Sequence, residues 1–177
     1  GTGTLQASGG SNYAGIGGGR YGYGYDSGAD IVIEGGIITA TGGNMAAGIG
    51  ANWGSSIGNI TINGGNVTAT GGIEAAGIGC GNGGGGNSSC GDITFASGTV
   101  VVNADQNTGW GVGSLAGNTS YYSCGNITFV GGSVTVKGGI ATTSEYGKLI
   151  YVDGESQGSD IYASSSNPFV YPKPATP

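Results

Sequence analysis

The sequence repeats itself roughly every 30 residues, and this repeat constrains the fold more strongly than any other feature. Its clearest copy, Gly58–Gly79, reads GNITINGGNVTATGGIEAAGIG. Three landmarks return at the same phase in other copies: an Ile-Thr-Ile segment, a Val-Thr-Ala segment and an Ala-Gly-Ile-Gly segment. A fixed period of this length is typical of solenoids, in which each unit buries its apolar face only against its neighbours.

Each copy contains short segments in which apolar and polar residues alternate, as they do in a strand rather than in a helix. In the clearest copy, Ile60 and Ile62 flank Thr61, and glycine pairs between the segments supply the turns. The same alternation in the Ala-Gly-Ile-Gly segments predicts that their first glycines lie on an outer face. These glycines are Gly15, Gly48, Gly77 and Gly111.

Stacking the copies turns each apolar position into a column inside the molecule. The sequence therefore predicts an all-β fold, a right-handed parallel β-helix (β-solenoid) of about five three-strand coils, with the hand taken from the general rule for parallel crossovers. We expect the coils in residues 1–145, and a C-terminal cap with an extended, Pro-containing tail in residues 146–177. One predicted column consists of Leu5, Ile38, Val67, Val100 and Val134.

Composition argues against several functions. Four Lys and Arg against ten Asp and Glu give a net charge of −6, so nucleic acid is not an expected partner. No apolar run is long enough for a membrane span. His is absent and no carboxylate cluster is apparent, so we expect no enzyme activity, cofactor or metal site. Asp30, Asn59, Asp92 and Asn126 share one column, which favours a hydrogen-bonding stack over an acid–base pair.

The tandem GxITIxGGxVTATGG and AAGIG units resemble the glycine-rich β-helix repeats of large secreted or wall-attached bacterial surface proteins. This resemblance covers residues 1–140, implies an extracellular or cell-surface location, and brings no active-site residues with it. The low content of charged residues, 8%, favours the same location. The chain opens inside a copy of the repeat, so we expect it to be a piece of something longer.

The favoured functional hypothesis is a structural or adhesive module. An open first coil and a face of bare glycine backbone would let another chain approach closely. The expected partners are therefore copies of the chain or adjoining repeats, in a fibre or a surface stalk. We expect the tail Asn167–Pro177 to be the segment that crosses to a neighbour.

An alternative hypothesis is a carbohydrate-binding module for extracellular glycans, because aromatic residues gather where the repeat varies in length and such rings stack on sugars. An ice-binding surface is less favoured, since the outward Thr-x-Thr pair occurs only at Thr39/Thr41 and Thr68/Thr70. The candidate glycan-binding residues are Tyr21, Tyr23, Tyr25, Trp53, Trp110, Tyr121 and Tyr122.

The chain has three cysteines, Cys80, Cys90 and Cys124. Cys80 and Cys90 flank one loop, whereas Cys90 and Cys124 hold the same place in successive copies. A Cys80–Cys90 disulfide, a Cys90–Cys124 disulfide and three reduced thiols are all compatible with these positions, and of the two bridges the Cys80–Cys90 disulfide is favoured. The spacing does not predict a metal site, because it lacks the CxxC pattern.

Overall fold

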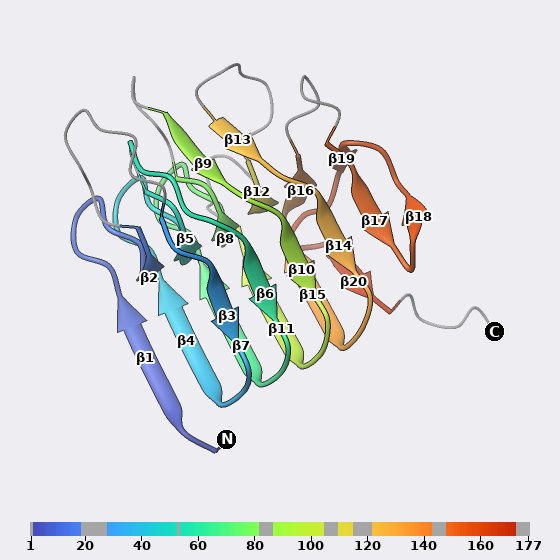
Figure 1. Cartoon of the computed structure of the whole chain (residues 1–177), viewed down its shortest axis with the longest axis horizontal. Helices are drawn as coiled ribbons and strands as arrows, with labels where there is room; N and C mark the ends of the chain where they lie inside the picture. The colour runs from blue at the N-terminus through green and yellow to red at the C-terminus, as the bar shows by residue number, and fades with distance from the viewer. Residues whose placement is uncertain are drawn as a thin grey trace.

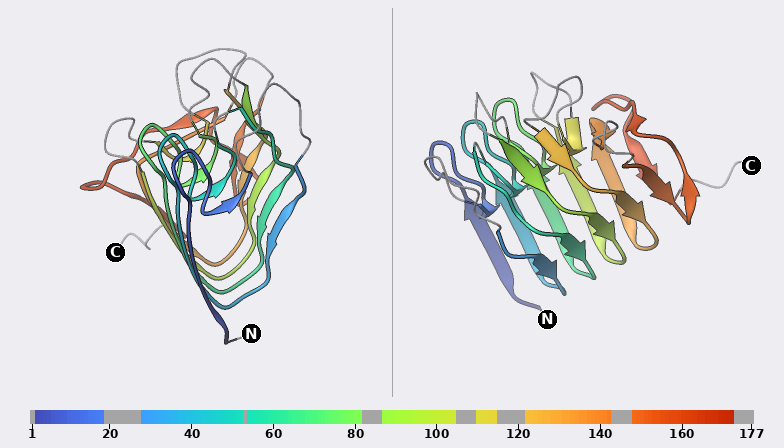
Figure 2. Two further views of the ribbon diagram at one scale, coloured as in Figure 1. Left: turned by 90° about the vertical axis from the view of Figure 1, so that its left-hand side faces the viewer. Right: turned by 45° about the horizontal axis from the view of Figure 1, so that its top comes forward.

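The computed structural model describes residues 2–18, 28–52, 54–81, 87–104, 110–114, 122–142 and 148–172. In these ranges the secondary structure consists of strands and turns, without a helix. None of the described residues therefore belongs to a helix long and apolar enough to cross a membrane. Successive coils are displaced along one axis (Figure 1), and viewed along that axis they nest inside one another (Figure 2, left).

Among the described residues, the strands of the coils form three six-stranded sheets and one two-stranded sheet. Sheet 1 contains β1 (Thr4–Ser8), β4 (Ile37–Thr41), β7 (Asn66–Thr70), β11 (Thr99–Asn103), β15 (Ser133–Lys137) and β20 (Phe169–Tyr171). Sheet 2 contains β3 (Ile31–Ile33), β6 (Ile60–Ile62), β10 (Ile93–Phe95), β14 (Ile127–Phe129), β17 (Ile150–Val152) and β18 (Glu155–Ser156). Sheet 3 contains β2 (Ile16–Gly17), β5 (Ile49–Gly50), β8 (Ile78–Gly79), β12 (Trp110–Gly113), β16 (Gly139–Ala141) and β19 (Asp160–Ile161). The small sheet pairs β9 (Ser88–Cys90) with β13 (Tyr122–Cys124).

The predicted parallel β-solenoid is confirmed, because strands of successive coils pair parallel and in register. Ile60 pairs with Ile93, and Ile93 pairs with Ile127, as the repeat alignment predicts. All three side chains are fully buried. Fully burying an Ile contributes about 1.5–3 kcal/mol, so stability comes mainly from contacts between coils rather than within one.

At the C-terminal end each large sheet finishes with an antiparallel strand. Strand β20 pairs with β15, β19 with β16, and β18 with β17. Aromatic rings cover the last part of the core: Phe129 stacks on Phe95 with ring centroids 4.8 Å apart, and Phe169 and Tyr171 lie against Phe129 at 4.9 and 5.8 Å. These strands close the C-terminal end of the solenoid.

The closing strand β20 corrects one expectation. The segment Asn167–Pro177 was expected to cross to a neighbour, but Phe169–Tyr171 pairs with β15 of its own chain. Tyr171 is buried, and its hydroxyl donates a hydrogen bond to Asp153 Oδ1 at 2.6 Å. Phe169 and Tyr171 therefore pack within their own chain, whereas residues 173–177 lie outside the described part.

Candidate functional site

The first coil, formed by β1, β2 and β3, differs from the others because none of the described residues covers its outer side. The column of Leu5 shows the difference: Leu5 is 48% exposed, Ile38 in the next coil 8%, and Val67 after it 1%. In the columns of Ile16 and Ile31 the first residue is likewise half-buried, whereas the residues behind them are fully buried. The described part of the apolar core thus ends in an uncovered face that contains Leu5, Ile16 and Ile31, and we call this face the first rung.

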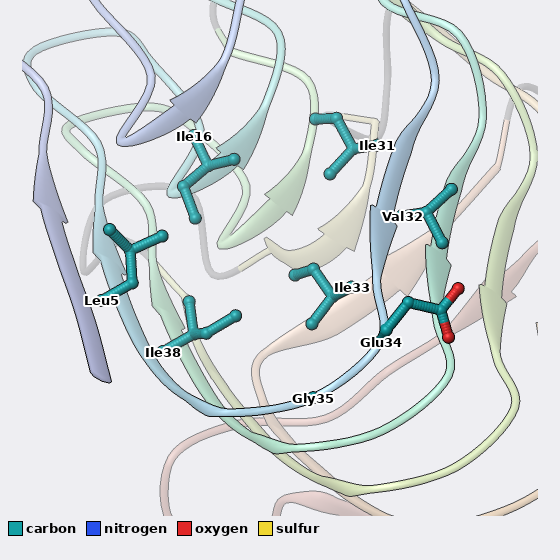
Figure 3. Close-up of a pocket in the computed structure, with 8 residues that line it drawn as sticks. All are labelled: Leu5, Ile16, Ile31, Val32, Ile33, Glu34, Gly35 and Ile38. Atoms are coloured by element: carbon teal, nitrogen blue, oxygen red, sulfur yellow. The ribbon is translucent and has the colours of Figure 1, made fainter. Parts of the chain in front are cut away.

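Side chains of the first rung line an open hollow of about 430 Å³. Figure 3 shows Leu5, Ile16, Ile31, Ile33 and Ile38 around the space enclosed by the coil. The lining residues are Leu5, Ile16, Ile31, Val32, Ile33, Glu34, Gly35 and Ile38. Only one of them is charged, and its carboxylate accepts a hydrogen bond from an Asn side chain of the next coil at 3.0 Å. The hollow is therefore a mostly apolar surface.

Strand β1 also presents backbone hydrogen-bonding groups on its outer edge. Gly3 C=O accepts from Ile37 N–H at 2.8 Å, and Gly9 N–H donates to Thr41 O at 2.9 Å, so both glycines face β4. Because the peptide groups of a strand alternate in direction, Thr4, Gln6 and Ser8 direct theirs away from β4. Edge strands are usually protected by charge, Pro or a bulge. The sequence of β1, TLQAS, has neither a charged residue nor Pro.

The predicted glycine face is not an outer surface. Gly48, Gly77 and Gly111 are buried, and Gly15 is half-buried in the first coil. A Cβ on Gly48 would lie 2.7 Å from Thr70 O, and one on Gly111 would lie 2.4 Å from Val136 Cγ1. These glycines lie against the neighbouring sheet, so there is no room for a side chain. The prediction that they form an association surface is therefore wrong.

The predicted aromatic ligand site is described only in part. Tyr21, Tyr23, Tyr25, Trp53 and Tyr121 lie outside the described residues. Trp110 and Tyr122 are half-buried on β12 and β13. Trp110 pairs with Tyr162 at a ring-centroid distance of 5.9 Å, and Tyr162 is 82% exposed. The sequence pattern missed Tyr162, because this residue follows the last recognisable copy of the repeat.

The column of Asn and Asp residues is a hydrogen-bonded ladder, as predicted. Asp30 Oδ1 accepts from Asn59 N–H at 2.7 Å, Asn59 Oδ1 from Asp92 N–H at 2.9 Å, and Asp92 Oδ1 from Asn126 N–H at 2.8 Å. Asn126 Oδ1 continues the ladder by accepting from Leu149 N–H at 3.0 Å. Each side chain thus joins its own coil to the next. The described residues contain no group of metal-ligating side chains arranged to hold a metal ion.

The three cysteines converge, although sequence reasoning treated them as alternative pairs. Cys90 Sγ lies 3.0 Å from Cys124 Sγ and 3.4 Å from Cys80 Sγ. All three side chains are buried thiols. The hydrogen bonds of Cys90 with Cys124 and with Cys80, together with burial, raise the pKa of Cys90 well above its ordinary value. For Cys124 the hydrogen bond with Cys90 lowers the pKa, but burial and the charge of Cys80 raise it more, so the net shift is upward.

A family model described as a beta helix repeat matches residues 1–20, 31–55 and 60–86. These ranges contain strands β1 to β8 and therefore include the first rung. Comparisons with curated proteins and with solved structures gave no match. The family match and the solenoid topology together support a β-helix repeat module.

Proposed function

We propose that this chain is a structural β-solenoid module that associates through its first rung with another coil of the same kind. In the proposed assembly, that coil is the first rung of a second copy. The main observation in support is the increase in burial along the column of Leu5, from 48% exposed at Leu5 to 1% exposed at Val67. A coil placed over the first rung would bury Leu5, just as the coil of β4 buries Val67 in β7.

A two-fold axis perpendicular to the solenoid axis brings β1 of one copy antiparallel to β1 of the other. Such an interface is self-complementary, because the same patch serves both copies. The chain itself supplies a precedent, since β20 pairs antiparallel with β15 and covers the core with Phe169 and Tyr171. The outward peptide groups of Thr4, Gln6 and Ser8 would then be hydrogen-bonded across the interface.

Within the described residues this arrangement has one association surface, because antiparallel strands occupy the other end. Copies joined through their first rungs therefore form a closed pair rather than a growing fibre. In a longer assembly the same surface would receive an adjoining repeat of a stalk. The low charge and the resemblance to bacterial surface repeats support an extracellular, adhesive setting for such a unit.

The test measures the mass of the purified chain by sedimentation equilibrium across a concentration series. The wild type is expected to pair. Replacing Gln6 with Pro removes an outward N–H while leaving the peptide groups that bond β4, so it should prevent pairing without unfolding the coil. A mass of one chain at every concentration for the wild type would refute the proposal.

A matched pair of variants tests the apolar contribution. Leu5 lines the hollow and is 48% exposed, whereas Ile37 is 50% exposed but does not line it. Burying Leu5 from both copies contributes about 1.5–3 kcal/mol, because each side chain begins half-exposed. Leu5→Ser should weaken pairing by roughly 10- to 100-fold, and Ile37→Ser should leave it unchanged. Equal effects of the two variants would contradict the proposed surface.

A second candidate function, glycan binding, is supported by the Trp110–Tyr162 ring pair with its exposed Tyr162. Exposed amphipathic rings are suited to contact with sugars and peptides. Quenching of Trp fluorescence by extracellular polysaccharides tests this function, with Tyr162→Ala as the variant and Tyr13→Ala as the control for an exposed Tyr elsewhere. Unchanged affinity in Tyr162→Ala would remove the support that this pair provides.

A further inference from the structure

The three cysteines occupy one buried position where two successive coils meet. Cys90 and Cys124 are direct partners in the register of the parallel strands β9 and β13. Neighbouring parallel strands lie about 4.8 Å apart, which is within the Cα separation that a disulfide spans. Cys80 approaches the same sulfur from the residue after β8, and its thiol also donates to Ser123 O at 3.2 Å.

We propose that this cluster is a disulfide site in which Cys90 is the shared sulfur, Cys124 its preferred partner, and Cys80 a third thiol able to replace Cys124. Cys90 can form one disulfide at a time, so the two bridges exclude each other. The Cys90–Cys124 bridge links successive coils, whereas the Cys80–Cys90 bridge closes a loop within one coil.

Two observations favour Cys124 over Cys80. The Sγ–Sγ distance is 3.0 Å for Cys90–Cys124 and 3.4 Å for Cys80–Cys90. The sequence separation is 34 residues for the first pair and 10 for the second. In the loop-closure model a bridge across the longer loop restricts the unfolded chain more strongly. The inter-coil bridge is therefore preferred by both distance and loop length.

The chemistry is a two-electron oxidation by a small disulfide such as oxidised glutathione. The thiolate of Cys90 attacks one sulfur of the oxidant and releases one glutathione thiolate. Cys124 then attacks Cys90 Sγ in the mixed disulfide, releasing the second glutathione and leaving the protein bridge. In a later exchange the thiolate of Cys80 attacks Cys90 Sγ, forms the Cys80–Cys90 bond and releases Cys124 as a thiolate.

Burial and the raised pKa values of Cys90 and Cys124 set the conditions for this reaction. Because the thiolate is the nucleophile, oxidation should be slow at neutral pH and faster as the pH rises. The same burial should shield the completed bridge from external thiols. We therefore expect slow formation and slow reduction.

The test oxidises the intact chain with oxidised glutathione at mildly alkaline pH, blocks remaining thiols with iodoacetamide under denaturing conditions, and maps peptides without reduction. We expect a linked Cys90–Cys124 peptide pair and an alkylated Cys80. The bridge should raise the unfolding midpoint by roughly 5–15 °C relative to the reduced chain. Three alkylated cysteines, a Cys80–Cys124 link or a predominant Cys80–Cys90 link would overturn the assignment.

Variants test the shared sulfur and the exchange. Cys80→Ala should still form the Cys90–Cys124 bridge, whereas Cys124→Ala should form Cys80–Cys90 instead. Cys90→Ala should form neither, and a Cys80–Cys124 bridge in that variant would refute the central role of Cys90. Peptide mapping of the wild type decides the preferred pair even if a variant fails to fold.

Discussion

The burial of Gly111 gives a quantitative test of the packing between sheets 1 and 3. A methyl group added in Gly111→Ala would lie 2.4 Å from Val136 Cγ1, whereas its next nearest neighbour, Gly139 O, is 3.6 Å away. Carbon atoms in favourable contact lie about 3.5–4.0 Å apart, so the side chain of Val136 must move by more than 1 Å. The substitution therefore produces a local steric conflict with a single side chain.

The expected cost follows from these distances. Inserting a methyl group into a packed core typically costs about 1–3 kcal/mol, and replacing a strand glycine by Ala returns about 0.5–1 kcal/mol. Gly111→Ala should therefore destabilise the chain by about 1–2 kcal/mol. Val136→Ala removes two buried methyl groups and should cost about 2 kcal/mol. In the double variant the new methyl group occupies the space that Val136 vacates, so the two costs should not add.

The assay is chemical denaturation followed by circular dichroism for the wild type, both single variants and the double variant. We expect a favourable coupling free energy of about 1–2 kcal/mol in this cycle. Gly48→Ala serves as a contrast, because its Cβ would meet backbone atoms, Thr70 O at 2.7 Å and Gly77 O at 2.8 Å, which no truncation removes. Additive effects, or a Gly111→Ala variant as stable as the wild type, would show that this glycine does not face the core.

Two further predictions concern the C-terminal strands that close the solenoid and the hydrogen-bonded ladder of Asn and Asp side chains. The hydrogen bond to Asp153 raises the pKa of Tyr171, and burial adds to this shift. The stability that the protonated Tyr171 hydroxyl contributes is therefore present below about pH 10 and is lost as the pH rises through the raised pKa. The unfolding midpoint of Tyr171→Phe, followed from pH 8 to pH 11.5, should therefore fall less steeply above pH 10 than that of the wild type, and parallel curves would contradict this role. Asp92→Ala should lower stability by about 1 kcal/mol because Asn126 N–H loses its acceptor, whereas Asp92→Asn, which keeps an amide oxygen, should be neutral in the same denaturation assay.

The fold could be predicted from the sequence because identical positions of a solenoid meet in space. Ile60, Ile93 and Ile127 recur at one phase of the repeat, and parallel in-register pairing is the arrangement that stacks them. The ladder of Asp30 and Asn59 could be predicted for the same reason. In both cases the contact joins equivalent residues, so the repeat alignment alone identifies the partners.

Whether the glycines of the Ala-Gly-Ile-Gly segments face the core or the outside could not be predicted from the repeat alignment. Strict alternation places Gly77 outside if Ile78 lies inside, but the chain bends in this segment and regular pairing begins only at Ile78. The missing Cβ of Gly77 would lie 2.4 Å from Val102 Cγ1, on the core side. Residues before the strand thus do not follow its period of two.

The ends of the solenoid were also beyond the repeat pattern. Phe169 and Tyr171 have no equivalents in earlier coils, so no column predicts that they cover Phe129. The convergence of Cys80 on Cys90 has the same cause, since Cys80 is not in the column that the other two cysteines share. Contacts between residues at different positions of the repeat can be identified only when the three-dimensional path of the chain is known.

The difference between the two ends of the solenoid also implies a gradient of local stability along it. An inner coil is hydrogen-bonded to a neighbour on both sides, whereas β1 pairs only with β4 among the described strands. In a linear array of this kind each unit is stabilised mainly by its immediate neighbours, so local opening begins where one neighbour is lacking. In the unpaired chain, for example at low concentration, amide hydrogens of β1 should therefore exchange with solvent before those of β7 and β11. Opening then proceeds coil by coil from Thr4 toward the aromatic cluster around Phe129, where the backbone is protected longest.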